Sequence, residues 1–386
     1  MAEHLPASNS DGFVPRLALL YAGFFIFMGV QMPFFPIWLK SQGLDPQAIG
    51  LVLAAPMVVR IVAVPLASRV ADRRTELAGL LAAASIASVA GYAVVGLCRG
   101  EIMILAAIAV ASIALTPVGP LTDAYALQGL GWRRRSYGTV RLWGSAAFVG
   151  ANLGAGSLLD VISPRHLVWA MVASLGLMAG AALQLVPAGG NRETHEARYL
   201  LRPGFGSLFW AIAVAASLIQ ASHAVYYGFS TLNWAARGLN GTIIGVLWAL
   251  GVVAEIALFA VSGRLVGRIG PTALVGLGAT GAVLRWAAMG LEPPIWTLPG
   301  LQLLHGLSFG ATHLGTMQCV SEFAPAGRRA TAMGDLSTLM AIVMAVAMSL
   351  AGVLYGSYGS GAYGAMALGA LIGGTIVLAA SFLARN

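Results

Sequence analysis

The feature that most constrains this chain is an internal repeat at a shift of 195 residues, which matches residues 42–73 to residues 237–268. The matched pairs are Gly43 and Gly238, Leu44 and Leu239, Ile49 and Ile244, Gly50 and Gly245, Ala54 and Ala249, Arg69 and Arg264, and Arg73 and Arg268. Because the shift is close to half of the 386 residues, the chain reads as two copies of one large unit. Chance similarity of two apolar runs is the alternative, and it does not explain the matching loops.

Each copy contains an apolar run with one ionisable residue near its centre, Arg60 in the first copy and Glu255 in the second. The chain is 58% hydrophobic and only 9% charged, whereas soluble domains carry roughly 25% charged residues. Apolar runs of about 20 residues are long enough to cross a bilayer, and at this length they are helical. We therefore expect a membrane protein. The N-terminus has no basic leader region, so its first apolar run is expected to be a retained helix.

The apolar runs predict an all-α membrane protein with twelve transmembrane helices in two pseudo-symmetric six-helix bundles. The expected helices are 14–39, 48–67, 77–97, 102–128, 138–159, 165–187, 206–234, 241–262, 272–290, 295–319, 331–354 and 361–383. Residues 1–187 are expected to form the N-terminal bundle, residues 188–204 a cytoplasmic linker, and residues 205–386 the C-terminal bundle. Two repeats with a charge deep in a helix are typical of transporters.

The net charge of +8 would suit a nucleic-acid partner, but the position of the charges argues for a different role. Most of the loop arginines fall in alternate loops, on the side where the termini lie, and few basic residues fall in the other loops. This is the positive-inside pattern, which places the N- and C-termini in the cytoplasm of a bacterial-type inner (plasma) membrane. No nucleic-acid partner is expected.

Ionisable side chains near the bilayer centre cost about 2.5–3.5 kcal/mol each, so those present are candidates for function. They are Arg60, Asp123, Arg141, His223, Glu255, Arg285, His305, His313 and Asp335. A carboxylate in a low-dielectric medium favours its protonated form, and a nearby cation favours its ionised form. Glu255 is accordingly the candidate proton carrier, and a fixed ion pair is the alternative.

Helical spacing groups the polar side chains of two predicted helices. Steps of three and four residues place Gln220, His223, Tyr227 and Ser230 on one face of helix 206–234, and Gln302, His305, Phe309 and His313 on one face of helix 295–319. Two polar and aromatic faces favour a lined cavity, and polar contacts that hold helices together are the alternative. No metal site is expected, because His305 and His313 are two turns apart and no close carboxylate or thiol completes a ligand set.

The loop SRVADRR, residues 68–74, resembles the signature between helices 2 and 3 of the major facilitator superfamily. Asp72 and Arg73 keep the charged pair of that signature, whereas Ser68 stands where the family usually has glycine. In the second copy, Gly267 replaces the acid. We expect Asp72 and Arg73 to latch an inner gate against a neighbouring helix end, and a solvated basic turn is the alternative.

Further stretches resemble the lactose-permease side of this superfamily and, within it, the phenylpropionate permeases. They are PFFPIWL (33–39), PLTDAY (120–125), SYGTVRLWG (136–144), HAVYYGFSTLNW (223–234), and LRW with LLHGLSFGATH (284–313). The resemblance spans nearly the whole chain. It implies that Asp123 and Arg141 match the acid and arginine that hold sugar in lactose permease, and that Arg285 and His305 match its arginine and histidine.

The chain departs from lactose permease at three other positions. Gln302 replaces a lysine, Ser308 replaces the carboxylate that binds the coupling proton, and Glu255 lies about one turn from the corresponding glutamate. The proton mechanism of lactose permease therefore does not transfer residue by residue. The cation that pairs with Glu255, or that holds a substrate carboxylate in a two-pronged pair, is expected among Arg60, Arg141 and Arg285.

These features predict a monomeric, proton-coupled importer of a small aromatic or organic acid such as 3-phenylpropionate, working by alternating access. Its only energy source would be the proton gradient, with no cofactor, and aromatic walls for a phenyl ring are expected from Tyr226, Tyr227, Trp248 and Phe309. A sugar or nucleoside proton symporter and a drug or metabolite exporter are the alternatives. No nucleophile–base set indicates an enzyme, and a receptor or scaffold would not need so many charges inside the membrane.

Overall fold

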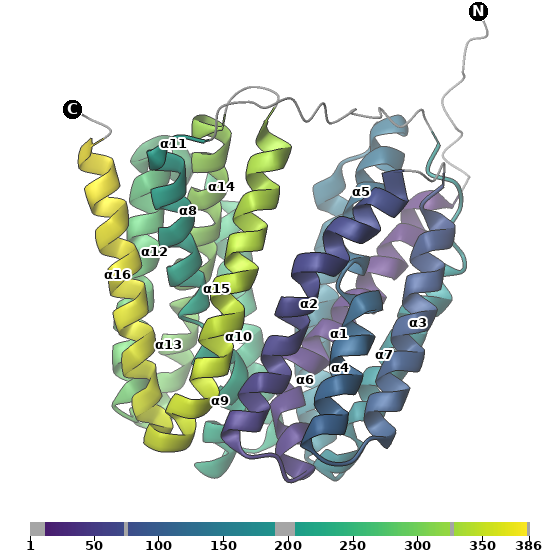
Figure 1. The fold of residues 1–386 in the computed structure, drawn as a ribbon, viewed down its shortest axis with the longest axis horizontal. Helices are drawn as coiled ribbons and strands as arrows, with labels where there is room; N and C mark the ends of the chain where they lie inside the picture. Colours follow the sequence, from purple (N-terminus) through teal and green to yellow (C-terminus); the bar gives the residue numbers. More distant parts are fainter. Residues whose placement is uncertain (1–11, 73–75, 190–204, 325–327, 384–386) are drawn as a thin grey trace, which may run out of the picture. The chain divides into compact units, whose positions relative to one another are not determined.

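A computed structural model describes residues 12–72, 76–189, 205–324 and 328–383, and the regular elements among them are all helices (Figure 1). The first half contains α1 (Phe13–Ser41), α2 (Pro46–Asp72), α3 (Ala78–Leu97), α4 (Glu101–Leu115), α5 (Val118–Trp132), α6 (Tyr137–Leu159) and α7 (Leu167–Ala182). The second half contains α8 (Ser207–Ala221), α9 (Ala224–Ala236), α10 (Gly241–Ala260), α11 (Ser262–Ile269), α12 (Pro271–Gly290), α13 (Leu298–Leu303), the π-helix η3 (Gly306–Ala311), α14 (Thr312–Phe323), α15 (Arg329–Tyr358) and α16 (Ala362–Leu383). Short 3₁₀ turns are η1 (Pro164–His166), η2 (Ile295–Thr297) and η4 (Gly359–Gly361).

The predicted fold class of twelve transmembrane helices is confirmed. Among the described residues, 10 stretches are long and apolar enough to cross a membrane. One of them, Thr331–Phe382, is 52 residues long and holds two crossings, α15 and α16. The predicted helix 295–319 is broken into α13, η3 and α14, so it does not form one continuous apolar helix of that length.

Two further predicted helices are interrupted where the sequence analysis expected continuous ones. The predicted helix 102–128 divides into α4 and α5 at Thr116 and Pro117, because proline has no N–H to continue the hydrogen-bond ladder. The predicted helix 206–234 divides into α8 and α9 at Ser222 and His223. By contrast, α1 runs through Pro33 and Pro36 as one helix.

The internal repeat reappears as the same turn in both halves. Gly43 and Gly238 both adopt positive φ, at 90° and 87°, which only glycine adopts without strain. In each copy the next polar residue caps the following helix: Asp45 accepts from the Ala48 N–H at 2.8 Å, and Asn240 accepts from the Ile243 N–H at 2.9 Å. The repeat therefore specifies how a helix ends, turns and restarts.

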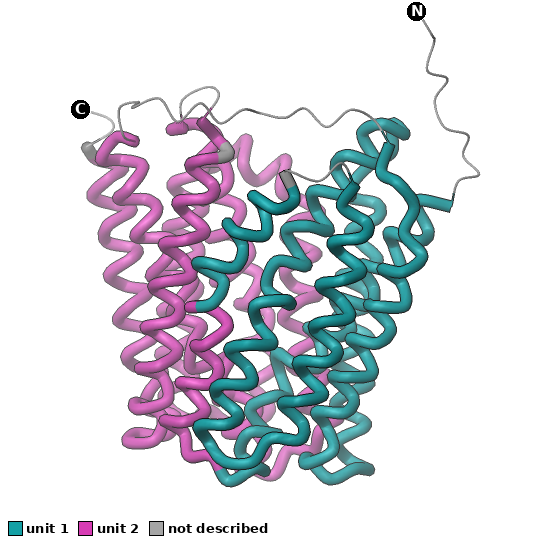
Figure 2. Tube along the Cα trace, turned by 45° about the vertical axis from the view of Figure 1, so that its right-hand side comes forward, with its two compact units in different colours: residues 1–43, 59–198 teal, residues 44–58, 199–386 magenta. Residues whose placement is uncertain are grey.

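Contacts divide the chain into two compact units, residues 1–43 with 59–198 and residues 44–58 with 199–386 (Figure 2). Residues 44–58, which include the start of α2, belong to the second unit because they pack on α15; a Cβ added to Gly50 would lie 2.9 Å from the Gly352 Cα. The division into bundles at residues 187 and 205 stays a prediction. Within the first unit α1 packs against α6 and α7, and within the second unit α12 packs against α14, η3 and α16.

Candidate functional site

Arg285 lies at the centre of a polar cluster in the second unit. Its side chain projects from α12, is fully buried, and donates from one terminal nitrogen to His305 Nδ1 at 2.9 Å and from the other to Gln302 Oε1 at 2.7 Å. The guanidinium carbon lies 4.4 Å from the centroid of the Tyr226 ring and 4.7 Å from that of Trp286. Hydrogen bonds and cation–π contacts thus replace the water that the buried charge has lost.

His305 connects this buried cation to the carboxylate of Glu255. Because arginine can only donate, His305 Nδ1 must accept from Arg285, which leaves the proton on Nε2. That nitrogen lies 4.0 Å from Glu255 Oε2, on α10. Arg285 therefore sets the tautomer in which His305 directs an N–H towards Glu255. Arg285 and Glu255 thus both contact this histidine, and the cation that pairs with Glu255, expected among Arg60, Arg141 and Arg285, stays a prediction.

His223 is held in the opposite way by its own backbone. Its Nδ1 lies 3.1 Å from the Gln220 carbonyl oxygen, which can only accept, so Nδ1 carries the proton. Its Nε2 then accepts from the Ser308 hydroxyl at 3.2 Å, and the same hydroxyl accepts from Arg285 at 3.4 Å. The position where the resemblance implied a proton-binding carboxylate thus holds a hydroxyl that links His223 to Arg285.

An aromatic column extends from this cluster along the broken helix. The ring of His305 stacks on Phe309 with centroids 5.3 Å apart and planes at 12°, and Phe309 stacks on His313 at 6.0 Å and 4°. His305 is buried, whereas Phe309 and His313 are partly exposed, as is Tyr227, which stacks on His223 at 5.6 Å. The column consists of His305, Phe309 and His313.

The wide turn of η3 and the glycines around it allow this cluster to form. A Cβ added to Gly306 would lie 2.9 Å from the Ala254 carbonyl oxygen, so α10 approaches η3 backbone to backbone. On the other side, a Cβ on Gly281 would lie 2.8 Å from Leu307 Cβ. Single π-turns of this kind are frequent at functional sites. Close packing on both sides keeps His305 between Arg285 and Glu255.

A second, different cluster surrounds Asp123 in the first unit. Asp123 Oδ1 on α5 accepts from the Tyr21 hydroxyl at 2.6 Å and from the Tyr137 hydroxyl at 2.9 Å. Arg141 lies one turn after Tyr137 on α6, and its guanidinium carbon lies 4.1 Å from the centroid of Phe25. Among the described residues, no ion pair joins Arg141 to Asp123.

Arg60, which was also predicted, takes no part in either cluster. Arg60 is exposed near the middle of α2, with no hydrogen bond or ion pair to another described residue. Asp72 is the last residue of α2, and Arg73 lies outside the described residues, so the gate latch stays a prediction. No group of three His, Cys, Asp or Glu side chains among the described residues is arranged to hold a metal ion.

The partners of Asp123 were not predicted from the sequence. Tyr21 is 102 residues away in the chain and gave no signal. Tyr137 did carry a signal, because it lies four residues before Arg141 on the same helical face. In the second unit, Gln220, His223, Tyr227, Glu255, Arg285, Gln302, His305, Phe309 and His313 all join one connected set of contacts.

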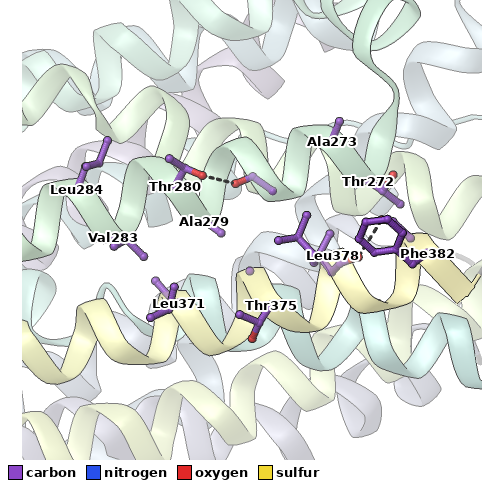
Figure 3. Close-up of a pocket in the computed structure, with 15 residues that line it drawn as sticks. Thr272, Ala273, Ala279, Thr280, Val283, Leu284, Leu371, Thr375, Leu378 and Phe382 are labelled. Carbon is purple, nitrogen blue, oxygen red and sulfur yellow. Dashed lines mark hydrogen bonds between the residues drawn. The ribbon is translucent and has the colours of Figure 1, made fainter.

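A cavity of about 560 Å³ lies elsewhere in the second unit, between α12 and α16 (Figure 3). Its lining contains none of the predicted site residues and no ionisable group. The buried charges therefore identify the candidate site better than this cavity does.

A chain that crosses the membrane this many times, with histidines and charges buried inside its helices, is a multi-pass membrane transporter rather than an enzyme. The MFS_1 like family model matches residues 14–379, and the chain belongs to that family of the major facilitator superfamily.

Relatives of known name agree with this membership. The chain is 32% identical over 363 residues to a probable 3-phenylpropionic acid transporter of Escherichia coli (strain K12), covering 89% of this chain and 92% of the relative. It is 30% identical over 337 residues to a maltose permease of Geobacillus stearothermophilus, covering 83% and 82%. A crystal structure of the nucleoside transporter NupG matches with a TM-score of 0.80 at 14% identity, covering 95% of this chain and 98% of that one, which shows the shared fold.

Proposed function

We propose that this secondary transporter imports a small aromatic acid, such as 3-phenylpropionate, together with protons. The observation that carries the proposal is the connection of a buried cation to a carboxylate through one histidine, Arg285 to His305 to Glu255, beside a partly exposed aromatic column. The similarity to a probable 3-phenylpropionic acid transporter supports this substrate class.

Glu255 is the proton carrier in this proposal. Its side chain is 22% exposed, so protons can reach it, whereas the His305 side chain is 9% exposed and its Nε2 lies 4.0 Å from the carboxylate. When Glu255 is ionised, the His305 N–H stabilises the charge; when Glu255 is protonated, that contact weakens. The state of Glu255 is thus communicated to the aromatic column through the ring of His305.

The aromatic column supplies the contact for a phenyl ring. Phe309 and His313 are parallel and partly exposed, and offset stacking with such rings contributes about 0.5–1.5 kcal/mol beyond area burial. The substrate carboxylate requires an accessible cation. Arg285 is fully buried with both terminal nitrogens engaged, so it does not supply this cation.

Glu255→Gln separates proton coupling from substrate binding. In proteoliposomes, uptake of labelled 3-phenylpropionate driven by a pH gradient should collapse, while counterflow exchange without a gradient should continue. Glu322→Gln, on an exposed position of α14, is the matched control and should leave both unchanged. If Glu255→Gln leaves gradient-driven uptake intact, Glu255 is not the proton carrier.

Competition in counterflow tests the substrate class. Unlabelled 3-phenylpropionate should compete with the labelled compound, whereas lactose and uridine should not. Phe309→Ala should weaken binding of the aromatic acid by about tenfold or less, the loss of one stacking contact. Competition by lactose instead would support a sugar symporter.

Sugar symport is the second candidate, because the chain is also similar to a maltose permease. Asp123 is the residue that would bind a sugar hydroxyl, since it already accepts from two phenol hydroxyls. Asp123→Asn would then abolish transport of maltose. Maltose transport that survives in this variant, or that is absent in the wild type, would remove the sugar candidate.

We further propose a bacterial inner membrane location, cytoplasmic N- and C-termini, and a monomer as the working unit. The excess of arginine in alternate loops supports this orientation. A cysteine introduced at Arg165 should be labelled by an impermeant maleimide added outside the cell. A cysteine introduced at Arg268 should be labelled only after the membrane is permeabilised.

A further inference from the structure

The cavity between α12 and α16 is a groove with large side chains along its rims and small residues along its floor (Figure 3). Its rims include Leu284, Leu371 and Leu378, which are 59%, 51% and 57% exposed. Gly276 and Gly374 line the groove between these rims, and their lack of side chains creates its depth. A Cβ added to Gly276 would meet nothing within 4 Å, so the groove is open above this residue.

Three of the four hydroxyls that line the groove, all except that of Thr272, are hydrogen-bonded within their own helices. The Thr280 hydroxyl donates to the Gly276 carbonyl, the Thr375 hydroxyl to Ile372, and the Ser381 hydroxyl to Val377. Side chains bonded back to the helix in this way leave little polar surface for a ligand. An occupant would meet mostly methyl and methylene groups along the length of the groove, which suits a hydrocarbon chain.

The length of the groove matches one leaflet of a bilayer. It runs from Thr272 to Leu284 on α12 and from Phe382 to Ala370 on the antiparallel α16. At 1.5 Å per residue, about twelve steps of helix span about 18 Å. Half of the ~30 Å hydrocarbon core is about 15 Å. The groove can hold one acyl chain from the edge of the membrane to its middle.

Positive charge stands at one end of this groove. Arg264 and Arg268 are four residues apart on the short helix α11, so they share one face, and both are exposed. α11 leads directly through Gly270 into Pro271 and Thr272, the first residues of α12. Neither arginine has a hydrogen bond or ion pair to another described residue. Basic pockets beside membrane helices bind anionic lipid head groups.

We propose that this groove is a binding site for an anionic phospholipid, with one acyl chain between α12 and α16 and the phosphate at Arg264 and Arg268. The chain is held by van der Waals contact with the small-residue floor, which lets it approach the helix backbones closely. The head group is held by two charges one helical turn apart. The site is separate from the polar cluster around Arg285.

Native mass spectrometry of the full chain in detergent, titrated with dioleoyl phosphatidylglycerol or dioleoyl phosphatidylcholine, tests both halves of the site. Arg264→Gln and Arg268→Gln should each weaken phosphatidylglycerol binding by about fivefold, the equivalent of the ~1 kcal/mol per basic residue near an anionic surface. Phosphatidylcholine binding should change little. Arg165→Gln, an exposed arginine in the first unit, is the matched control and should leave both lipids unaffected.

Filling the groove tests the acyl-chain half. Gly276→Leu and the rim variant Thr280→Phe should weaken binding of both lipids by about threefold or more, because contacts with the floor are lost. Gly369→Leu on α16 is the control, since its added side chain also meets open space but does not line the groove. A thermal unfolding midpoint equal to that of the wild type shows that a variant is folded. If Gly276→Leu does not fold, lipid binding by Thr280→Phe alone tests the acyl-chain site.

Three results would overturn the proposal. Lipid binding that is unchanged in both folded groove variants would remove the acyl-chain site. Equal binding of the two lipids in the wild type, with no response to the arginine variants, would remove the head-group site. A dimer that the groove variants abolish would show that a second copy of the chain occupies the groove.

Discussion

The two units place a charge inside an apolar fold in opposite ways. In the first unit Asp123 is held by two phenol hydroxyls, and Arg141 lies over an aromatic ring; both stay partly exposed. In the second unit Arg285 is fully buried, and His305, Gln302 and Ser308 accept from it. The two terminal nitrogens of this buried cation have protein acceptors in place of water, whereas an exposed cation keeps part of its water.

The two units differ in how tightly their charged groups are held. The acceptors of Arg285 are fixed by packing on both sides of η3, so a change in Glu255 acts on an ordered chain of contacts. Asp123 and Arg141 make few contacts and remain available to a ligand. We infer that the second unit responds to protons and that the first unit presents accessible charge.

Of the variants considered, Arg285→Lys should destabilise the protein most. A small effect would contradict the contrast drawn between the two units. A lysine ammonium cannot reach His305 and Gln302 together, and it loses the planar stacking with Tyr226 and Trp286. We expect a loss of about 3 kcal/mol or more in stability and loss of transport. Thermal unfolding in detergent and uptake in proteoliposomes measure the two effects.

Arg141→Lys is the matched variant in the first unit. Its guanidinium makes cation–π contacts but no hydrogen bond to another described residue, so only about 0.5–1 kcal/mol of stability should be lost. Equal losses in the two arginine variants would show that burial of Arg285 does not distinguish the units.

Tyr21→Phe and Tyr137→Phe test how strongly the first unit holds Asp123. Each removes one hydrogen bond to Asp123 and keeps the ring, and a bond to a charged acceptor contributes about 1.5–3 kcal/mol. Tyr21, whose bond is 2.6 Å and whose ring is buried, should lie at the upper end. Tyr137, at 2.9 Å, should lie at or below the lower end.

The measurement is thermal unfolding of both single variants and of the same variants in an Asp123→Asn background. Removing the charge should reduce the effect of each tyrosine variant, because a neutral acceptor forms a weaker bond. If Tyr21→Phe destabilises the Asp123→Asn background as much as it destabilises the native chain, the hydrogen bond to Asp123 does not account for its effect.

The apolar runs were sufficient to predict where the membrane-spanning helices lie, because run length is a local property of the sequence. The break at η3 could not be predicted, since it lies where distant helices approach closely: Gly306 approaches Ala254, and Gly281 approaches Leu307. Arg285 and His305 were both identified as candidates through the resemblance to lactose permease, but their contact with one another was not predicted. Tyr21, from a distant helix, was not predictable, and no pattern near residue 21 marks it.

Within the second unit, the smaller effect should come from Ser308→Ala, which removes a hydroxyl between His223 and Arg285. Both of its contacts are long, at 3.2 and 3.4 Å, and Arg285 keeps its shorter bonds to His305 and Gln302. We expect a loss of about 1 kcal/mol or less, measured by thermal unfolding, with transport retained. The loss falls mainly on His223, whose Nε2 loses the Ser308 donor in a buried site. A loss of stability near that of Arg285→Lys would mean that this hydroxyl, rather than His305, is the main acceptor for the buried cation. The chain of contacts from Arg285 to Glu255 would then no longer distinguish the second unit from the first.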